Sequence, residues 1–300
     1  METKTATSLN RRDFLTASAA TAGAAAALAA VPGLACADAA SSADDEARAA
    51  FEAAAAPIPP VDVPASWDEE RQIVVVGSGA AGVNASIRLA QAGYDVLMVE
   101  RSISTGGNSQ CSSMFSNFGG HRLAEEAQWA YPSYPYDVDN IVEFMLSCQQ
   151  MTGDPELMRA MAVEGPKCID WMIDHADAKW VASNPTPGGT GLLQWDGMKT
   201  ETNGINVNYI PLQILVQKAQ DDGAEVRTSC NVETLVYDGE GVCGVKVKQD
   251  DGEKFIHATR GVILCAGGME VNRAMMAKYS ATCLKGIANI ATPPNGTGEC

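Results

Sequence analysis

The sequence predicts an α/β fold that opens with a Rossmann-like βαβ unit, and three observations support this prediction. Four β-branched residues, Ile73–Val76, run directly into the glycine spacing G-x-G-x-x-G. A helical segment follows and is stopped by Gly93. A second apolar run ends in Glu100, 18 residues after the last glycine of the motif. That separation is close to the ~20 residues expected for the carboxylate that binds ribose hydroxyls in a dinucleotide site.

The three glycines of the motif have separate physical roles. Gly77 lets the strand turn sharply, Gly79 lets the backbone come close to a pyrophosphate, and Gly82 lets the helix pack closely on the strand. The helix then directs the free N–H groups of its first turn at the phosphates. A glycine-rich turn that binds no ligand is the alternative. The complete order of strand, turn, helix, strand and acid favours the dinucleotide site.

The first 37 residues have the pattern of a twin-arginine export signal. Arg11-Arg12 is followed by Phe14-Leu15, an Ala-rich apolar stretch and a small-x-small end at Ala37, after which we expect cleavage. Because this route carries folded proteins, a cofactor can be loaded in the cytoplasm before export. We therefore expect a periplasmic location or a cell-surface or extracellular one.

Two other interpretations of this segment are weaker. A membrane anchor is disfavoured because the apolar stretch is short and rich in alanine, so no integral membrane span is predicted. Lipidation at Cys36 would require a larger apolar residue where the chain has Gly33. After the signal, residues 38–70 are rich in Ala and Pro and are expected to form a linker, with a little helix before the prolines. Residues 71–300 are expected to form the folded domain.

Composition limits the possible partners. A net charge of −16 over 300 residues disfavours binding to nucleic acid or to anionic lipid. The nine cysteines include no C-x-x-C pair, so covalent haem and a clustered iron–sulfur site are not predicted. Three scattered histidines give no metal-binding pattern. Most thiols after the signal are expected to be buried, among them Cys265 within an apolar strand.

The rest of the chain alternates between helical and extended patterns. Helices are predicted over 138–151, 155–174 and 210–222, and Asp154 is the expected N-cap of the second. A long loop rich in Gly, Asn, Thr and Pro is expected over 183–208. Short strands joined by Asp-Gly turns follow, and the last strand is apolar and buried. The predicted strands cover residues 225–229, 232–237, 242–248, 254–258 and 261–266.

Three further features, added to the opening motif, resemble the FAD-binding domain of the fumarate reductase/succinate dehydrogenase flavoprotein family. They are the segment Gly106-Gly107-Asn108-Ser109, the β-hairpin excursion, and the stretch GVILCAGG at 261–268. The resemblance covers 72–300 and is strongest to the soluble exported branch, which includes fumarate reductases, urocanate reductases and ketosteroid dehydrogenases. It implies a Rossmann-like FAD-binding domain, with a parallel sheet and a hairpin or meander excursion, that is incomplete at its C-terminus.

The resemblance also implies roles for individual residues. The opening motif would meet the pyrophosphate and Glu100 the adenosine ribose, while residues 107–109 would pass the phosphates and the flavin edge. The backbone of Val232 would hold adenine, and the return strand and the final turn would lie beside the flavin and its ribityl chain. The expected FAD-binding residues are Gly77, Gly79, Ala80, Ala81, Gly82, Glu100, Arg101, Gly107, Asn108, Ser109, Val232, Ala266, Gly267 and Glu299.

The chain departs from the family pattern in two places. Met114-Phe115 stands where the family has Gly-Gly, which would crowd the approach to the isoalloxazine. Glu299-Cys300 replaces Asp-Gly in the last turn. In the family a substrate-capping domain follows this turn. We therefore expect a truncated chain whose catalytic residues lie beyond Cys300, and we assign none within it.

The resemblance implies an FAD-dependent oxidoreductase that reduces an activated C=C bond in a small unsaturated substrate, with the flavin supplying the hydride chemistry outside the cytoplasm. Electrons would come from a cytochrome or another flavoprotein, in anaerobic respiration. Three alternatives stay open: a ketosteroid-dehydrogenase-like flavoenzyme, a truncated FAD-binding fragment without catalysis, and an NAD(P)-dependent dehydrogenase. The last is disfavoured because a nicotinamide domain has neither the 106–108 loop nor the hairpin excursion.

Overall fold

The structure is a computed structural model. It describes residues 49–50, 52–54, 56–111, 115–116, 119–127, 136–148, 153–183, 192–195, 209–279 and 297–298. The chain divides into two compact units, Met1–Ala54 and Ala55–Cys300. In the first unit, residues 49–50 and 52–53 are helical, in agreement with the little helix expected before the prolines. The predicted export signal lies outside the described residues, and all elements below belong to the second unit.

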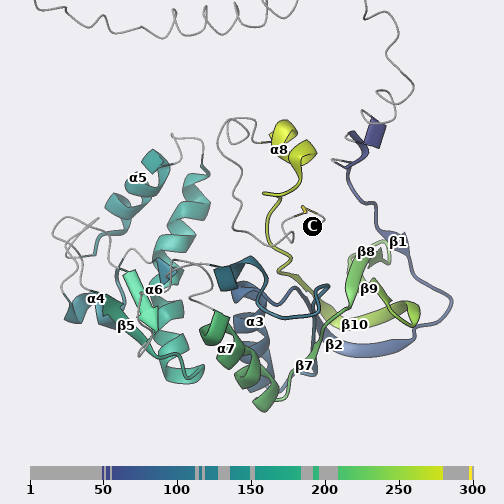
Figure 1. Cartoon of the computed structure of the whole chain (residues 1–300), viewed down its shortest axis with the longest axis horizontal. Helices are drawn as coiled ribbons and strands as arrows, with labels where there is room; N and C mark the ends of the chain where they lie inside the picture. Colours follow the sequence, from purple (N-terminus) through teal and green to yellow (C-terminus); the bar gives the residue numbers. More distant parts are fainter. Residues whose placement is uncertain are drawn as a thin grey trace, which may run out of the picture. The chain divides into compact units, whose positions relative to one another are not determined.

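A seven-stranded sheet organises the second unit (Figure 1). Its strands are β1 Val61–Asp62, β2 Glu69–Val76, β3 Val96–Val99, β7 Glu225–Arg227, β8 Asn231–Tyr237, β9 Val242–Gln249 and β10 Gly252–Leu264. They lie in the order β1-β8-β9-β10-β2-β3-β7. β10, β2, β3 and β7 run parallel, whereas β8, β9 and β10 form an antiparallel meander. The predicted α/β fold, a parallel sheet with a meander excursion, is confirmed.

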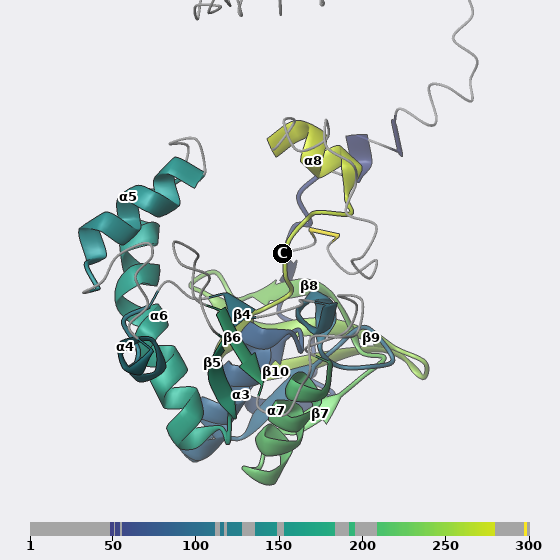
Figure 2. The ribbon, with the colours of Figure 1, turned by 60° about the vertical axis from the view of Figure 1, so that its left-hand side comes forward.

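Helices cover one face of the parallel strands and the meander covers the other. α3 (Ala80–Gln91) connects β2 to β3, and α7 (Tyr209–Asp221) leads into β7 beside it (Figures 1 and 2). Both helices contribute to a cluster with Val75 and Met98 of the sheet. The opposite face forms a second cluster: Val74, Val76, Leu97, Val99, Val245, Val247 and Ile256. Because both faces are buried, β2 and β3 read as continuous apolar runs.

Two further helices form a separate pair (Figure 2). α5 (Val138–Cys148) and α6 (Pro155–His175) match the predicted helices and enclose an apolar cluster of their own. Asp154 caps α6 as predicted, because its carboxylate accepts a hydrogen bond from the Glu156 N–H at 2.8 Å. Ile169 and Met172, further along α6, belong to the main cluster beneath α3 and α7. α6 therefore joins the helix pair to the sheet.

A short helix, α4 (Arg122–Glu126), begins at His121, whose side chain is completely buried. The Nδ1 atom of His121 accepts a hydrogen bond from the Ala124 N–H at 3.2 Å and so caps the helix. Burial lowers the pKa of His121 to about 4, because the charged imidazolium loses hydration in the interior. The neighbouring Arg122 contacts the Asp170 carboxylate at 3.1 Å, which ties α4 to α6.

The expectation of a loop over the whole of 183–208 is wrong. Leu192–Trp195 form a strand, β6, which lies between β4 (Phe115–Ser116) and β5 (Trp180–Ser183) in a small antiparallel sheet. The Gly, Thr and Pro residues around it favour loop conformation locally. Pairing on both sides and the complete burial of Leu193 in the main cluster hold the strand, and neither is visible in a local pattern.

Two other boundaries also differ from expectation. The strands expected over 254–258 and 261–266 are one strand, β10, with a register shift between Ala258 and Gly261 that absorbs the interruption. β1 lies inside the expected linker, where Val61 pairs with Val236 of β8 and the Thr234 hydroxyl donates to the Pro59 carbonyl at 2.8 Å. Among the described residues, no helix is long and apolar enough to cross a membrane.

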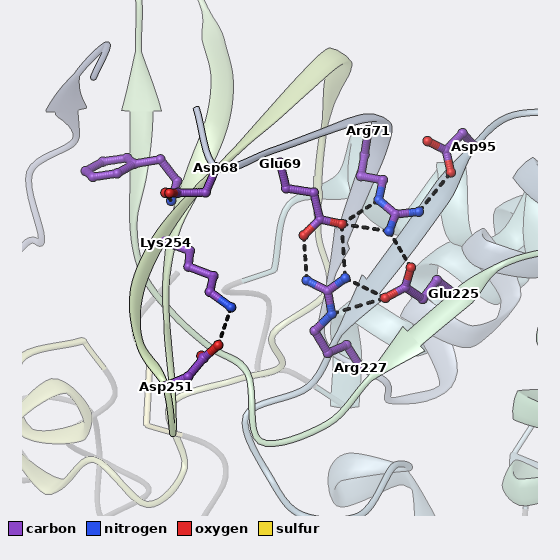
Figure 3. Close-up of polar contacts among 9 residues, drawn as sticks. Asp68, Glu69, Arg71, Asp95, Glu225, Arg227, Asp251 and Lys254 are labelled. Carbon is purple, nitrogen blue, oxygen red and sulfur yellow. Dashed lines mark hydrogen bonds and ion pairs between the residues drawn. The ribbon is translucent and has the colours of Figure 1, made fainter. Parts of the chain in front are cut away.

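Charged side chains meet near the amino-terminal ends of β2, β3 and β7 (Figure 3). Arg71 donates to Glu69 at 2.7 Å and to Asp95 at 3.2 Å, and it also contacts Glu225. Arg227 donates to Glu69 at 2.8 Å and to Glu225 at 2.5 Å. Hydrogen bonds from Arg227 and then Arg71 lower the pKa of Glu69 to about 2, against the opposing effect of burial. This five-residue network ties together strands that lie far apart in sequence.

Candidate functional site

The glycine motif forms the turn between β2 and α3. Gly77 has a φ of +100°, and a Cβ there would lie 2.4 Å from the carbonyl oxygen of Cys265, just after β10. A Cβ at Gly82 would lie 1.8 Å from the Gly77 carbonyl oxygen. Only glycine permits this packing of β10, the turn and α3. The predicted sharp turn and close helix–strand packing are therefore both present.

The first turn of α3 is prepared for a negatively charged group. It contains no acidic side chain, and its N-cap, Gly79, has no side chain that could accept a hydrogen bond from the helix. The Ala80 N–H donates to the Ser109 hydroxyl at 3.1 Å. A Cβ at Gly79 would also face Ser109, whose Oγ would be 3.4 Å away. A helix N-terminus of this kind attracts anions through its N–H groups and its dipole.

Glu100, at the end of β3, points its carboxylate toward the glycine turn. It is only 6% exposed. Its Oε2 accepts hydrogen bonds from the Ser78 N–H at 3.1 Å and the Ser78 hydroxyl at 2.5 Å, and its Oε1 accepts one from the Ser102 N–H at 2.9 Å. The Glu100 carbonyl accepts from the Cys230 N–H at 2.9 Å, two residues before Val232. The predicted ribose carboxylate therefore lies between the glycine turn and the start of β8.

The loop after Glu100 returns to the glycine turn through η2 (Gly107–Cys111), a 3₁₀-helix. The Gly106 N–H donates to the Ser78 hydroxyl at 3.0 Å, so this loop contacts the motif directly. Thr105 and Gln213 of α7 exchange two hydrogen bonds: the Thr105 hydroxyl donates to the Gln213 amide oxygen at 3.1 Å, and the Gln213 amide donates to the Thr105 carbonyl at 3.2 Å. The loop is held by the glycine turn through Gly106 and by α7 through Thr105.

Asn108 faces the chain that follows β10. Its side-chain amide nitrogen donates to the carboxylate of Glu270. Its amide oxygen is buried and has no hydrogen-bond partner among the described residues. A bound group that donates a hydrogen bond would satisfy this oxygen. The Glu270 carboxylate also lies over Gly268, where a Cβ would be 2.5 Å from Oε2.

A turn at Thr297-Gly298 completes this part of the molecule. The Arg101 guanidinium donates to the Thr297 hydroxyl at 2.7 Å, and the Asn272 amide donates to the Thr297 carbonyl at 2.8 Å. Asn272 also accepts from the Met275 N–H at 3.0 Å, so it precedes and caps α8 (Arg273–Tyr279). The Gly298 N–H donates to the Gly268 carbonyl at 3.1 Å. Arg101 and the stretch between β10 and α8 therefore fix the position of this turn.

Most of the predicted site residues are close to one another in the structure. The glycine turn, Glu100, Arg101 and the 107–109 segment are joined by the hydrogen bonds above, and β10 ends beside Gly77 before Ala266-Gly267. Val232 packs against the same cluster as Val99, the residue before Glu100. Met114 and Glu299 lie outside the described residues, and Phe115 pairs with Leu193 in the small sheet.

Sequence reasoning missed four residues that hold the site. Ser78, Gln213, Glu270 and Asn272 each bond to a predicted residue or to a segment that carries one. Ser78 could have been found, because it is the polar residue inside the motif and precedes Gly79. The other three have no local signal. Within the described ranges, no group of three or more His, Cys, Asp or Glu side chains could hold a metal ion.

Comparison with known proteins identifies one family. The profile of a family described as "FAD binding domain" matches residues 72–298. Digoxin reductase of Eggerthella lenta is 29% identical over 278 residues, covering 89% of this chain and 47% of that protein. NADH:fumarate oxidoreductase of Klebsiella pneumoniae is 27% identical over 216 residues, covering 72% of this chain and 22% of that protein. The chain thus spans less than half the length of these two relatives.

Solved structures give the same result for the fold. A 3-ketosteroid-Δ4-(5α)-dehydrogenase from Rhodococcus jostii superposes with a TM-score of 0.66 at 25% identity, covering 80% of this chain and 55% of the other. A flavocytochrome c3 fumarate reductase in an open conformation superposes with a TM-score of 0.59 at 23% identity, covering 80% of this chain and 39% of the other.

Proposed function

Because this chain belongs to the FAD binding domain family, we propose that it is the FAD-binding part of an oxidoreductase that reduces an activated C=C bond in a small unsaturated substrate. The observation that carries the proposal is the glycine turn, where β2, α3 and β10 meet so closely that only glycine fits. Relatives named as reductases of fumarate, urocanate and acrylate support the reaction class.

Two structural observations support FAD as the group held here. The first is the turn at 77–82, which leaves the start of α3 without a side-chain cap or an acidic residue and so suits a pyrophosphate. The second is the buried amide oxygen of Asn108, which has no donor among the described residues. Glu100 would accept hydrogen bonds from the adenosine ribose, and the backbone near Val232 would hold adenine. Arg101, Ala266, Gly267 and Glu299 remain proposed contacts of the same cofactor.

FAD, when bound, supplies the hydride chemistry of such enzymes. The residues of this chain bind and orient it. The 107–109 segment approaches the turn from one side through Ser109, and the chain after β10 approaches Asn108 from the other through Glu270. This arrangement favours FAD over a nicotinamide, because the 106–109 segment and the meander before β10 are not parts of a nicotinamide domain.

The location and the electron donor belong to the same proposal. The twin-arginine pattern at Arg11-Arg12 supports export of the folded, FAD-loaded protein to the periplasm or cell surface. Similarity to proteins named as cytochrome-type fumarate reductases supports a cytochrome as donor, with a second flavoprotein as the alternative. Together these observations support a role in anaerobic respiration. The superposition at TM-score 0.66 supports a second candidate, a ketosteroid-dehydrogenase-like activity.

Flavin content and reoxidation test this proposal. The purified protein should be yellow, and heat should release FAD rather than FMN. After anaerobic photoreduction, fumarate, urocanate, acrylate and a 3-ketosteroid would be added separately, each beside its saturated counterpart. Because the chain spans less than half the length of its relatives, this second assay uses a protein of the relatives' full length that contains it. In that protein we expect one unsaturated compound to reoxidise the flavin faster than its saturated control. A colourless protein that does not bind added FAD would contradict the cofactor, and equal reoxidation with every compound would contradict the reaction class.

A further inference from the structure

Ser78 is the most completely buried polar residue of the proposed FAD site. Its exposed fraction is 0%, and it lies inside the glycine turn between Gly77 and Gly79. Its hydroxyl donates to Oε2 of Glu100 at 2.5 Å and accepts from the Gly106 N–H at 3.0 Å. Both hydrogen-bonding directions of the hydroxyl are therefore used, and they reach the two ends of the loop between β3 and η2.

The two oxygens of the Glu100 carboxylate are not equivalent in this arrangement. Oε2 accepts two hydrogen bonds, both from Ser78, whereas Oε1 accepts one, from the Ser102 N–H. A carboxylate oxygen has about two lone-pair sites, so Oε1 keeps the freer acceptor position. A ribose hydroxyl would therefore bind Oε1, and Oε2 would serve to hold the carboxylate in its rotamer.

We propose that Ser78 is a positioning residue that fixes the Glu100 carboxylate for the adenosine ribose and, through Gly106, couples it to the segment that passes the pyrophosphate. This inference rests on the proposed FAD site. It gives a specific role to Ser78, which is not among the expected FAD-binding residues. The coupling is strong for a physical reason: in a buried site, hydrogen bonds to a charged group compete with little water. Without the hydroxyl, both Oε2 and the Gly106 N–H lose a buried partner.

The chain contains a suitable matched control. Ser86 lies on α3, is also 0% exposed, and its hydroxyl has no hydrogen-bond partner among the described residues. Ser86→Ala and Ser78→Ala therefore remove the same group from equally buried positions. They differ in that the Ser78 hydroxyl bonds to both Glu100 and Gly106 of the proposed site. A loss of affinity seen in both variants would reflect general loosening of the helix and turn.

The test is calorimetric titration of apo-protein with three probes: FAD, ADP and 2′,3′-dideoxy-ADP, which lacks the ribose hydroxyls. We expect Ser78→Ala to weaken FAD and ADP by about ten- to a hundredfold, the effect of losing a charge-assisted hydrogen bond. Its affinity for dideoxy-ADP should fall much less than its affinity for ADP, and Ser86→Ala should match the parent with all three. Ser78→Thr, which keeps the hydroxyl, should restore most of the loss.

A double-mutant cycle keeps the inference testable if Ser78→Ala folds poorly. In a Glu100→Gln background, Ser78→Thr and Ser78→Cys should differ much less in ADP affinity than they do in the parent. Equal weakening of ADP and dideoxy-ADP by Ser78→Ala would overturn the positioning role. Failure of the proposed FAD site itself would look different, because the parent protein would then bind neither FAD nor ADP.

Discussion

Arg101 donates a 2.7 Å hydrogen bond to the hydroxyl of Thr297, a residue 196 positions further along the chain. Arg101 directly follows Glu100, the proposed ribose carboxylate. Thr297 belongs to a turn that Asn272 and Gly268 also hold. One ion–hydroxyl contact therefore links the first βαβ unit of the domain to its last described segment. We therefore expect substitutions of Arg101 or Thr297 to change FAD binding at the proposed site.

Replacing Gly79 by Val should abolish flavin retention. The valine side chain would project toward Ser109, into the space where the backbone is expected to approach the pyrophosphate. The measurement is the ratio of flavin to protein absorbance after purification. Gly165→Ala on α6 is the control, because a Cβ there meets nothing within 4 Å and φ is not positive. A yellow Gly79→Val protein with parental stoichiometry would contradict the assignment of this turn.

Glu100→Ala should weaken FAD binding by about ten- to a hundredfold, which corresponds to roughly 1.5–3 kcal/mol for hydrogen bonds to a charged group. The buried donors of Ser78 and Ser102 would lose their acceptor as well, so the free energy of unfolding should also fall. Titration of apo-protein with FAD and urea unfolding measure the two effects. Glu143→Ala, at an exposed position on α5, should change neither. An unchanged FAD dissociation constant would exclude the ribose role.

Export should depend on the paired arginines of the N-terminal segment. Arg11→Lys combined with Arg12→Lys keeps the charge but removes the guanidinium pair that the twin-arginine pattern requires. We expect the precursor of this double variant to accumulate in the cytoplasm, as seen by fractionation and immunoblotting. Lys4→Arg, outside the pair, is the control. Parental export of the double variant would show that another pathway carries the protein.

Stability should fall between pH 6.5 and about 4 because of His121. Burial lowers its folded pKa from 6.5 to about 4, so the unfolded chain takes up the proton first as the pH falls. The contribution of neutral His121 to the free energy of unfolding is fully present above pH 6.5. It is lost as the pH falls toward 4, by about 3 kcal/mol at most. His121→Asn retains a capping side chain and should flatten urea-unfolding stability over this interval. The same slope in His121→Asn as in the parent protein would contradict the assignment.

A second acid-sensitive element is the network of Figure 3. Hydrogen bonds from Arg227 lower the folded pKa of Glu69 from 4.5 to about 2, so its contribution is present above 4.5 and is lost as the pH falls toward 2. Because Glu69 is partly exposed, the contribution should be about 1–3 kcal/mol. Glu69→Gln should reduce the slope of unfolding free energy in this interval. Glu70→Gln, the exposed neighbour, is the control, and equal slopes in both would exclude the network as the cause.

Local patterns were sufficient to predict the elements that depend on local physics. The β-branched run before Gly77, the Asp154 cap before Pro155 and the Asp-Gly turns each determine a conformation within a few residues. The glycine turn and the position of Glu100 followed from the same patterns. β2, α3, β3, α5, α6 and the meander accordingly lie where they were predicted.

The elements that were missed depend on partners distant in sequence. β6 is held by β5 on one side and β4 on the other, and β1 by Val236 of β8. Gln213 reads as an ordinary polar residue of a helix, and only the folded chain brings it to Thr105. The positioning role proposed for Ser78 also depends on the folded chain, because its hydroxyl bonds to Glu100 and Gly106.

β1 is two residues long and pairs with Val236 and Tyr237, the last two residues of β8. A strand whose N–H and C=O groups face solvent can pair with the same strand of another molecule, which is a common beginning of aggregation. At its other margin the sheet finishes with β7, which has three residues. Both margins are thus too short to be good templates for intermolecular pairing. At residues 61–62 the chain therefore covers the end of β8 against pairing with another molecule.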